Sequence, residues 1–104
     1  MREVKNRFGW FRGHWEEDGA VYNRWGLYRG RVDPDGTIVS RWGFRHGRVD
    51  PDGGIYSRFL GIRIGSVLPD GSVLNRFGRL RGNVEPNGNL IQMGAAARLL
   101  LLKR

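Results

Sequence analysis

An arginine followed directly by an aromatic residue recurs five times along this 104-residue chain. The five pairs are Arg7-Phe8, Arg24-Trp25, Arg41-Trp42, Arg58-Phe59 and Arg76-Phe77. A guanidinium can stack on an aromatic face, and it can also donate paired hydrogen bonds to a carboxylate or a phosphate. The pattern therefore indicates a structural stack, anion binding, or both. We expect these ten residues to form a structural ladder of arginine on aromatic.

A second group of arginines follows the pairs at variable distances. Its members are Arg12, Arg29, Arg45, Arg63, Arg79 and Arg81. Residues that build a repeated unit keep a fixed position in it, so we expect these six to be available as candidate anion-binding residues. The net charge of +8 also favours a polyanionic partner, such as nucleic acid, a lipid headgroup or an acidic protein.

The sequence carries no pattern typical of catalysis. His14 and His46 occupy different positions in the repeat, and a metal site needs three or four converging donors. Neither a nucleophile elbow nor a phosphate-binding P-loop is present, and the lack of cysteine excludes disulfides and thiolate sites. We therefore expect no enzyme activity, no metal site and no cofactor.

These residues are positioned by a tandem repeat that fills most of the chain. The five units span 7–23, 24–40, 41–57, 58–75 and 76–92, between a leader at 1–6 and an apolar tail at 93–104. Each unit has an Arg-aromatic-Gly opening, a second glycine, a short strand, a turn such as DPDG or EPNG, and a second strand. Such a short unit cannot bury its own apolar face and must pack on its neighbours.

The turn and strand chemistry predicts an all-β fold of five hairpins closed into a shallow barrel. Pro-Asp-Gly favours a tight turn, and apolar pairs such as Ile38-Val39 and Leu90-Ile91 suit strands. A propeller blade needs about 40 residues, and an open stack would expose edge strands. The leader either pairs with the last hairpin and closes the ring, or extends from it as a frayed end.

Charges of opposite sign are separated within each unit. Nine of the ten carboxylates lie in or beside the turns, namely Glu16, Glu17, Asp18, Asp33, Asp35, Asp50, Asp52, Asp70 and Glu85. The arginines instead open each unit. A closed ring would therefore gather the carboxylates in one zone and the arginines in another.

The tail, MGAAARLLLLKR, is rich in good helix formers and ends in two cations. A helix of about nine residues would be about 14 Å long, close to the depth of a shallow barrel. We expect Ala95 to Leu102 either to plug the barrel channel or to project as an anchor. The candidate plug residues are Leu99, Leu100, Leu101 and Leu102. The apolar run is far shorter than the roughly 20 residues of a membrane-spanning helix.

The iterated pattern of R-aromatic-G, then G, then V-x-P-D-G-x-V/I, over residues 7–92, resembles the bacterial β-flower proteins. This resemblance implies a short symmetric barrel with hairpin petals around a hydrophobic channel. Its architecture is similar to that of the tubby C-terminal domain, which binds phosphoinositides and threads an apolar helix through its centre. The resemblance implies no biochemical activity. MORN repeats, whose unit is longer at about 23 residues, and choline-binding repeats are more distant alternatives.

Three functions are compatible with these features. The leading one is a non-catalytic binding or scaffold module, whose basic, aromatic surface and axial channel contact membrane lipid headgroups from the cytoplasm, since membrane attachment needs both charge and apolar surface. The second is a nucleic-acid-binding module in which bases stack on the aromatic residues. The third is a structural or self-assembling domain that uses its tail as a plug or docks it into a protein partner.

Overall fold

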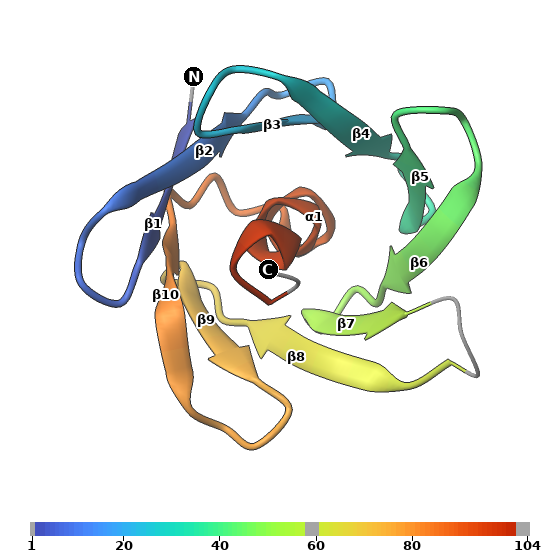
Figure 1. Ribbon diagram of the computed structural model, residues 1–104. Coiled ribbons are helices and arrows are strands. Elements are labelled where there is room, and N and C mark those ends of the chain that lie inside the picture. Colours follow the sequence, from blue (N-terminus) through green and yellow to red (C-terminus); the bar gives the residue numbers. More distant parts are fainter. Residues whose placement is uncertain (1, 58–60, 102–104) are drawn as a thin grey trace.

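The structure is a computed structural model that describes residues 2–57 and 61–101. Over these residues the chain forms a closed antiparallel barrel of ten strands, with one helix inside it (Figure 1). The predicted all-β barrel with a C-terminal helix is therefore confirmed. Arg58, Phe59 and Leu102, which belong to the predicted ladder and plug, lie outside the described residues.

The strands follow one another around the barrel in chain order. Their bounds are β1 Arg2–Asn6, β2 Phe11–Trp15, β3 Ala20–Asn23, β4 Tyr28–Val32, β5 Thr37–Ser40, β6 Arg45–Val49, β7 Gly54–Ser57, β8 Arg63–Val67, β9 Ser72–Asn75 and β10 Leu80–Val84. The barrel closes where β1 pairs with β10 and Val4 lies opposite Val84. Of the two arrangements predicted for the leader, pairing with the last hairpin is the one observed.

The acidic turns are stabilised by short-range hydrogen bonds that their own sequence supplies. In the turn after β4, the Asp35 carboxylate accepts a hydrogen bond from the Thr37 amide at 2.9 Å. Gly36 lies between them with a φ of +95°, which glycine adopts without the strain that a Cβ causes. The Thr37 amide lowers the pKa of Asp35, and the Ser72 amide lowers the pKa of Asp70 in the same way.

The turns at the other end depend on the small polar residue that closes each unit. The Asn23 side-chain oxygen accepts hydrogen bonds from the amides of Trp25 at 2.9 Å and Leu27 at 3.0 Å. Equivalent bonds are made by the side chains of Asn6, Ser40 and Asn75. Such side-chain-to-amide bonds favour a turn, which explains why Asn or Ser comes directly before the arginine of these units.

The fifth unit departs from the predicted hairpin. Helix α1 (Leu90–Leu101) begins at the residues predicted to form a second strand, and β1 occupies that place in the barrel wall. The strand predicted at Leu90 and Ile91 is therefore wrong, and α1 has 12 residues rather than about nine. The side chain of Asn89 caps the helix by accepting a hydrogen bond from the Gln92 amide at 3.1 Å, as an N-cap residue does.

Helix α1 lies at the centre of the hydrophobic core (Figure 1). Its residues Met93, Ala96 and Ala97 have no exposed surface, and they belong to one cluster with inward-facing wall residues such as Trp15 and Ile55. Burial of this apolar surface is the main force that holds the helix in place. The tail therefore fills the barrel, and the alternative of a projecting anchor is wrong for α1.

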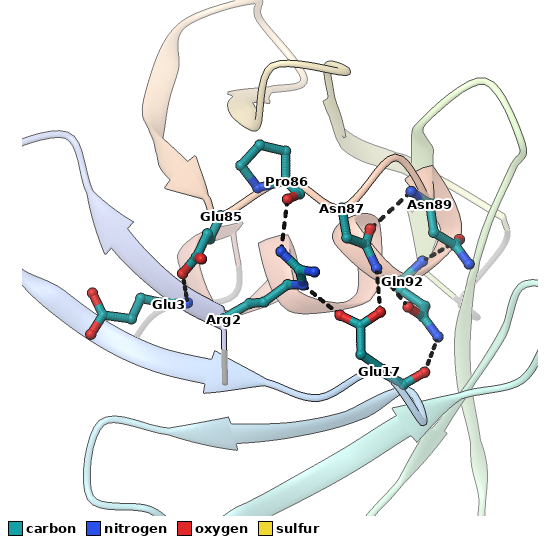
Figure 2. A network of polar contacts seen from close by, with 8 residues as sticks. All are labelled: Arg2, Glu3, Glu17, Glu85, Pro86, Asn87, Asn89 and Gln92. Atoms are coloured by element: carbon teal, nitrogen blue, oxygen red, sulfur yellow. Dashed lines mark hydrogen bonds and ion pairs between the residues drawn. The ribbon is translucent and has the colours of Figure 1, made fainter.

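A polar network fixes the start of the helix at the acidic end of the barrel (Figure 2). The Glu17 carboxylate forms an ion pair with Arg2 and accepts a hydrogen bond from the Asn87 side chain at 3.2 Å. Gln92 donates to the Glu17 carbonyl at 2.7 Å, and Arg2 donates to the Pro86 carbonyl at 3.0 Å. The hydrogen bonds from Arg2 and Asn87 lower the pKa of Glu17. The network thus joins β1, the first acidic turn and α1.

The central position of the helix predicts a large difference between two leucines. Leu100 is 3% exposed inside the barrel and Leu80 is 50% exposed outside it. We expect Leu100→Ala to lower the free energy of unfolding by about 2–5 kcal/mol, because the truncation leaves a cavity. Leu80→Ala, the matched control, should change it by less than about 1 kcal/mol. Urea unfolding of the two variants measures both values, and equal effects would contradict a filled barrel.

The Glu17 network predicts a defined acid sensitivity. Because the pKa of Glu17 is lower in the folded chain than its ordinary value of 4.5, its contribution to stability is present above that pH and is lost as the pH falls through the folded pKa. Wild type should be more stable than Glu17→Gln at neutral pH, and this difference should shrink in acid below pH 4.5. Thermal unfolding across this range measures it. A difference that is independent of pH would contradict the prediction.

Candidate anion-binding site

The two ends of the barrel carry opposite charges. Successive turns of a barrel whose strands follow chain order lie at alternate ends, so all Arg-aromatic-Gly loops share one end and all carboxylate-bearing turns share the other. We call these loops the petal loops. They are residues 7–10, 24–27, 41–44 and 76–79, together with Gly61 and Ile62 of the loop between β7 and β8. In Figure 1 the loops at 7–10, 41–44 and 76–79 extend outward from the barrel.

Each fully described petal loop carries one arginine stacked on its own aromatic residue. The Arg24 and Arg41 guanidinium carbons lie 4.3 Å from the ring centroids of Trp25 and Trp42. The corresponding distances in the Arg7-Phe8 and Arg76-Phe77 pairs are 4.9 Å. These four pairs of the predicted ladder thus form separate stacks, one in each loop. The aromatic rings are 67–73% exposed, so the stacks lie on the surface and outside the core.

A second set of exposed apolar residues lies beside these stacks, and the sequence analysis missed it. Its members follow the loop glycine directly, and they are Trp10, Leu27, Phe44 and Ile62. With Phe8, Trp25, Trp42 and Phe77 they surround one end of the barrel, and we call these eight residues the aromatic collar. Large exposed apolar residues gathered at one end of a domain indicate a binding site for a membrane or a protein. The apolar residue that follows the loop glycine in four of the five units is the sequence signal that could have revealed it.

The six predicted anion-binding arginines fall into two groups. Arg45, Arg63 and Arg79 are exposed, at or just after the end of a petal loop. Arg12, Arg29 and Arg81 each precede the second glycine of a unit, at a position that His46 and Ile64 occupy in the other two units. The structure therefore brings only half of the predicted set, Arg12, Arg29 and Arg81, to equivalent places before the second glycine.

These equivalent places are β-bulges. In each unit the residue before the second glycine has no partner in the register of the neighbouring strand, so that Gly30 lies opposite Val21 and Tyr28 lies opposite Tyr22, with Arg29 as the extra residue. The five bulge residues are Arg12, Arg29, His46, Ile64 and Arg81. A bulge redirects its side chain. Here it turns these side chains toward hollows beside the last turn of α1.

At the glycine after each bulge an added Cβ would lie within 2.6 Å of a carbonyl oxygen of the neighbouring strand, and at three of the five it would also meet the helix. A Cβ atom at Gly13 would lie 2.6 Å from Leu99, and Cβ atoms at Gly65 and Gly82 would lie 2.7 Å from Leu101 and 2.8 Å from Leu100. The helix leucines therefore occupy the space that these three glycines leave. The predicted plug residues Leu99, Leu100 and Leu101 are thus placed in the barrel mouth.

At the remaining two glycines, Gly30 and Gly47, the nearest atoms all belong to the barrel wall. Consecutive helix residues point about 100° apart, so Arg98 faces a different sector from the three leucines that follow it. In this sector Arg98 and residues of the wall line a pocket of about 130 Å³. We call it the Arg98 pocket. Its polar lining includes the bulge residues Arg29 and His46.

Arg98 carries a partly buried charge that no carboxylate balances among the described residues. Its Nη1 donates a hydrogen bond to Nδ1 of His46 at 3.4 Å, because a guanidinium can only donate. Its Nε is buried and has no hydrogen-bond partner in residues 2–57 and 61–101. Burial lowers the pKa of Arg98 to about 10, so the side chain is still charged at neutral pH. The other arginine that lines the pocket, Arg31, pairs with Asp33 at 3.3 Å.

Arg98 was missed as a site residue by the sequence analysis. The signal was present, because Arg98 is the one charge within the apolar run of the tail, and a charge there needs a reason. His46 was considered only as a metal ligand. In the part of the chain that the structure describes, no three His, Asp or Glu side chains gather where a metal ion could bind.

No protein-family model, no curated protein and no solved structure matches this chain. No helix within the described residues combines the length and the apolar character needed to cross a membrane. The candidate functional features are therefore the aromatic collar and the Arg98 pocket, which lie at the same end of the barrel.

The unbalanced charge of Arg98 predicts an unusual effect on stability. Arg98→Met removes the partly buried charge and keeps a long side chain with good helix propensity, so in dilute phosphate-free buffer we expect the free energy of unfolding to rise by about 1–4 kcal/mol. Arg76→Met, at an exposed petal position, is the matched control and should stay within about 0.5 kcal/mol of wild type. Chemical denaturation decides this. A destabilised Arg98→Met would show that the charge is balanced within the fold.

Proposed function

We propose that this protein is a non-catalytic binding module whose petal loops dock on an anionic membrane surface. The observation that carries the proposal is the aromatic collar, in which rings such as Trp25 and Trp42 are about 70% exposed and have arginines stacked on them. A soluble barrel with a filled core gains nothing in folding stability from exposing these rings. Their repetition at one end favours an external apolar partner.

The pairing of aromatic and arginine suits the boundary between lipid and water. Aromatic side chains partition into the headgroup region, and cations near an anionic surface gain about 1 kcal/mol each. Stable attachment generally needs both elements together, and every petal loop described in full supplies both. The carboxylates at the far end of the barrel would then face away from the membrane, which gives the docked protein a defined orientation.

Two alternatives have weaker support. A nucleic-acid partner could stack bases on the same rings, but single strands are usually bound in a basic groove, whereas the collar consists of separate loops that project outward. A docking peptide formed by the tail is disfavoured because α1 is buried in the barrel. Assignment to the β-flower proteins is a proposal of the same kind, supported by the repeat and the closed barrel.

Two leucines at opposite ends of the barrel test the proposed orientation. Leu27 is 55% exposed in a petal loop, and Leu68 is 41% exposed beside an acidic turn. In sedimentation with phosphatidylglycerol-containing vesicles, wild type should bind in a salt-sensitive manner. Leu27→Ala should weaken binding and Leu68→Ala should not. The double change Trp25→Ala/Trp42→Ala should weaken it at least about ten-fold, or about 1.4 kcal/mol, less than the burial of one large apolar side chain provides.

The same variants separate the alternatives. Equal losses for Leu27→Ala and Leu68→Ala would contradict docking through the petal loops. No binding to vesicles, together with salt-dependent binding of single-stranded or duplex nucleic acid that the double tryptophan change removes, would replace the membrane by nucleic acid as the partner.

A further inference from the structure

The Arg98 pocket is a cluster of positive and polar groups built from three separate elements. Arg98 comes from α1, Arg29 from the bulge of β4, and His46 from the bulge of β6. The cavity beneath them is lined by the buried apolar residues Ile38 and Ala95. The pocket is therefore a small depression with an apolar floor and a charged mouth.

The physical state of Arg98 favours an anion at this place. A buried charge without a partner is costly, and proteins relieve the cost by pairing it or by moving it into water. Here the Nε group is buried without a hydrogen-bond partner in the described chain, and the Arg98 side chain lines an open pocket. No described residue offers a carboxylate in an ion pair with Arg98. The missing counter-charge would then come from a ligand.

We propose that the Arg98 pocket binds a single phosphate group, held by the guanidinium groups of Arg98 and Arg29 and by the imidazole of His46. Arginine is suited to phosphate because its donors match the spacing of two phosphate oxygens. Donors that approach from α1, β4 and β6 fit a tetrahedral group with several oxygens better than a planar carboxylate.

The size of the pocket limits the ligand. Its volume of about 130 Å³ is several times the roughly 30 Å³ that one water molecule occupies in the liquid. One phosphate with part of its ester substituent fits this space, whereas a nucleotide would extend far beyond it. Arg29 and His46 are exposed, so an anion can reach the mouth of the pocket from solvent.

The location of the pocket connects it to the collar. Arg29 and His46 each follow a petal loop by only a few residues, and these loops carry Trp25 and Trp42. On a membrane that contacts both tryptophans, a phosphomonoester headgroup would come close to the pocket mouth; this part of the inference rests on the proposed function. A soluble phosphate ester offers the same chemistry without a membrane.

Inorganic phosphate tests the pocket by itself. At constant ionic strength set with sodium chloride, phosphate should raise the thermal unfolding midpoint of wild type in a saturable manner. Arg98→Met should abolish this rise, and Arg29→Met, at an exposed position that is tolerant of change, should shift it to higher phosphate concentration. Arg45→Met, on the same strand as His46 but outside the pocket lining, should respond as wild type does. An equal rise in wild type and Arg98→Met, or no rise in wild type, would overturn the proposal.

Vesicles then identify the source of the phosphate. Phosphatidic acid ends in a phosphomonoester and phosphatidylglycerol does not. Because a phosphomonoester can carry a second negative charge, the two kinds of vesicle are prepared with equal surface charge. A several-fold preference for phosphatidic acid that Arg98→Met removes would support a lipid headgroup in the pocket. Equal binding to both, with phosphate stabilisation intact, would support a soluble ester. Loss of all vesicle binding, with the same stabilisation, would overturn the membrane function and still support the pocket.

Discussion

The structure depends on the need to fill a ten-stranded barrel. About eight strands give an interior that wall side chains alone can fill, and a wider ring leaves space along its axis. Helix α1 occupies this space with a succession of small residues, Gly94 to Ala97, and then with three leucines that follow Arg98. The wall accommodates the leucines because glycine lies where each of them approaches. Packing at the axis thus explains the composition of the tail, and the glycines at residues 13, 65 and 82 leave room for its leucines.

A single helix cannot match a wall with five similar units. Three bulge glycines, at residues 13, 65 and 82, lie against a leucine of α1. In the sector of Gly30 and Gly47 the helix instead presents Arg98, which lines a pocket. The candidate anion site therefore lies at the mismatch between an approximately five-fold wall and a helix that has about 3.6 residues per turn. The repeated units form the barrel and the aromatic collar. The Arg98 pocket lies in the one sector where the helix does not match the repeated wall.

The two ends of the barrel differ in the side chains that form their turns, because two kinds of turn alternate along the chain. At the acidic end, carboxylates bind backbone amides within the turns, and the Glu17 network attaches the helix to the wall. At the other end, asparagine or serine side chains form the turns, so the arginine and aromatic residues are not needed for that purpose. This difference explains why the exposed aromatic residues are found at one end.

The sequence by itself determined the repeat, the turns, the all-β class and the separation of charge, because these follow from bonds between residues close in the chain, such as the one from the Thr37 amide to Asp35. It did not determine that Leu90 and Ile91 enter a helix, which depends on β1 filling the tenth place in the wall. Nor did it single out Arg98 or divide the six arginines. Those outcomes depend on bulge register and on helix packing between residues far apart in the chain, and only the closed barrel decides them.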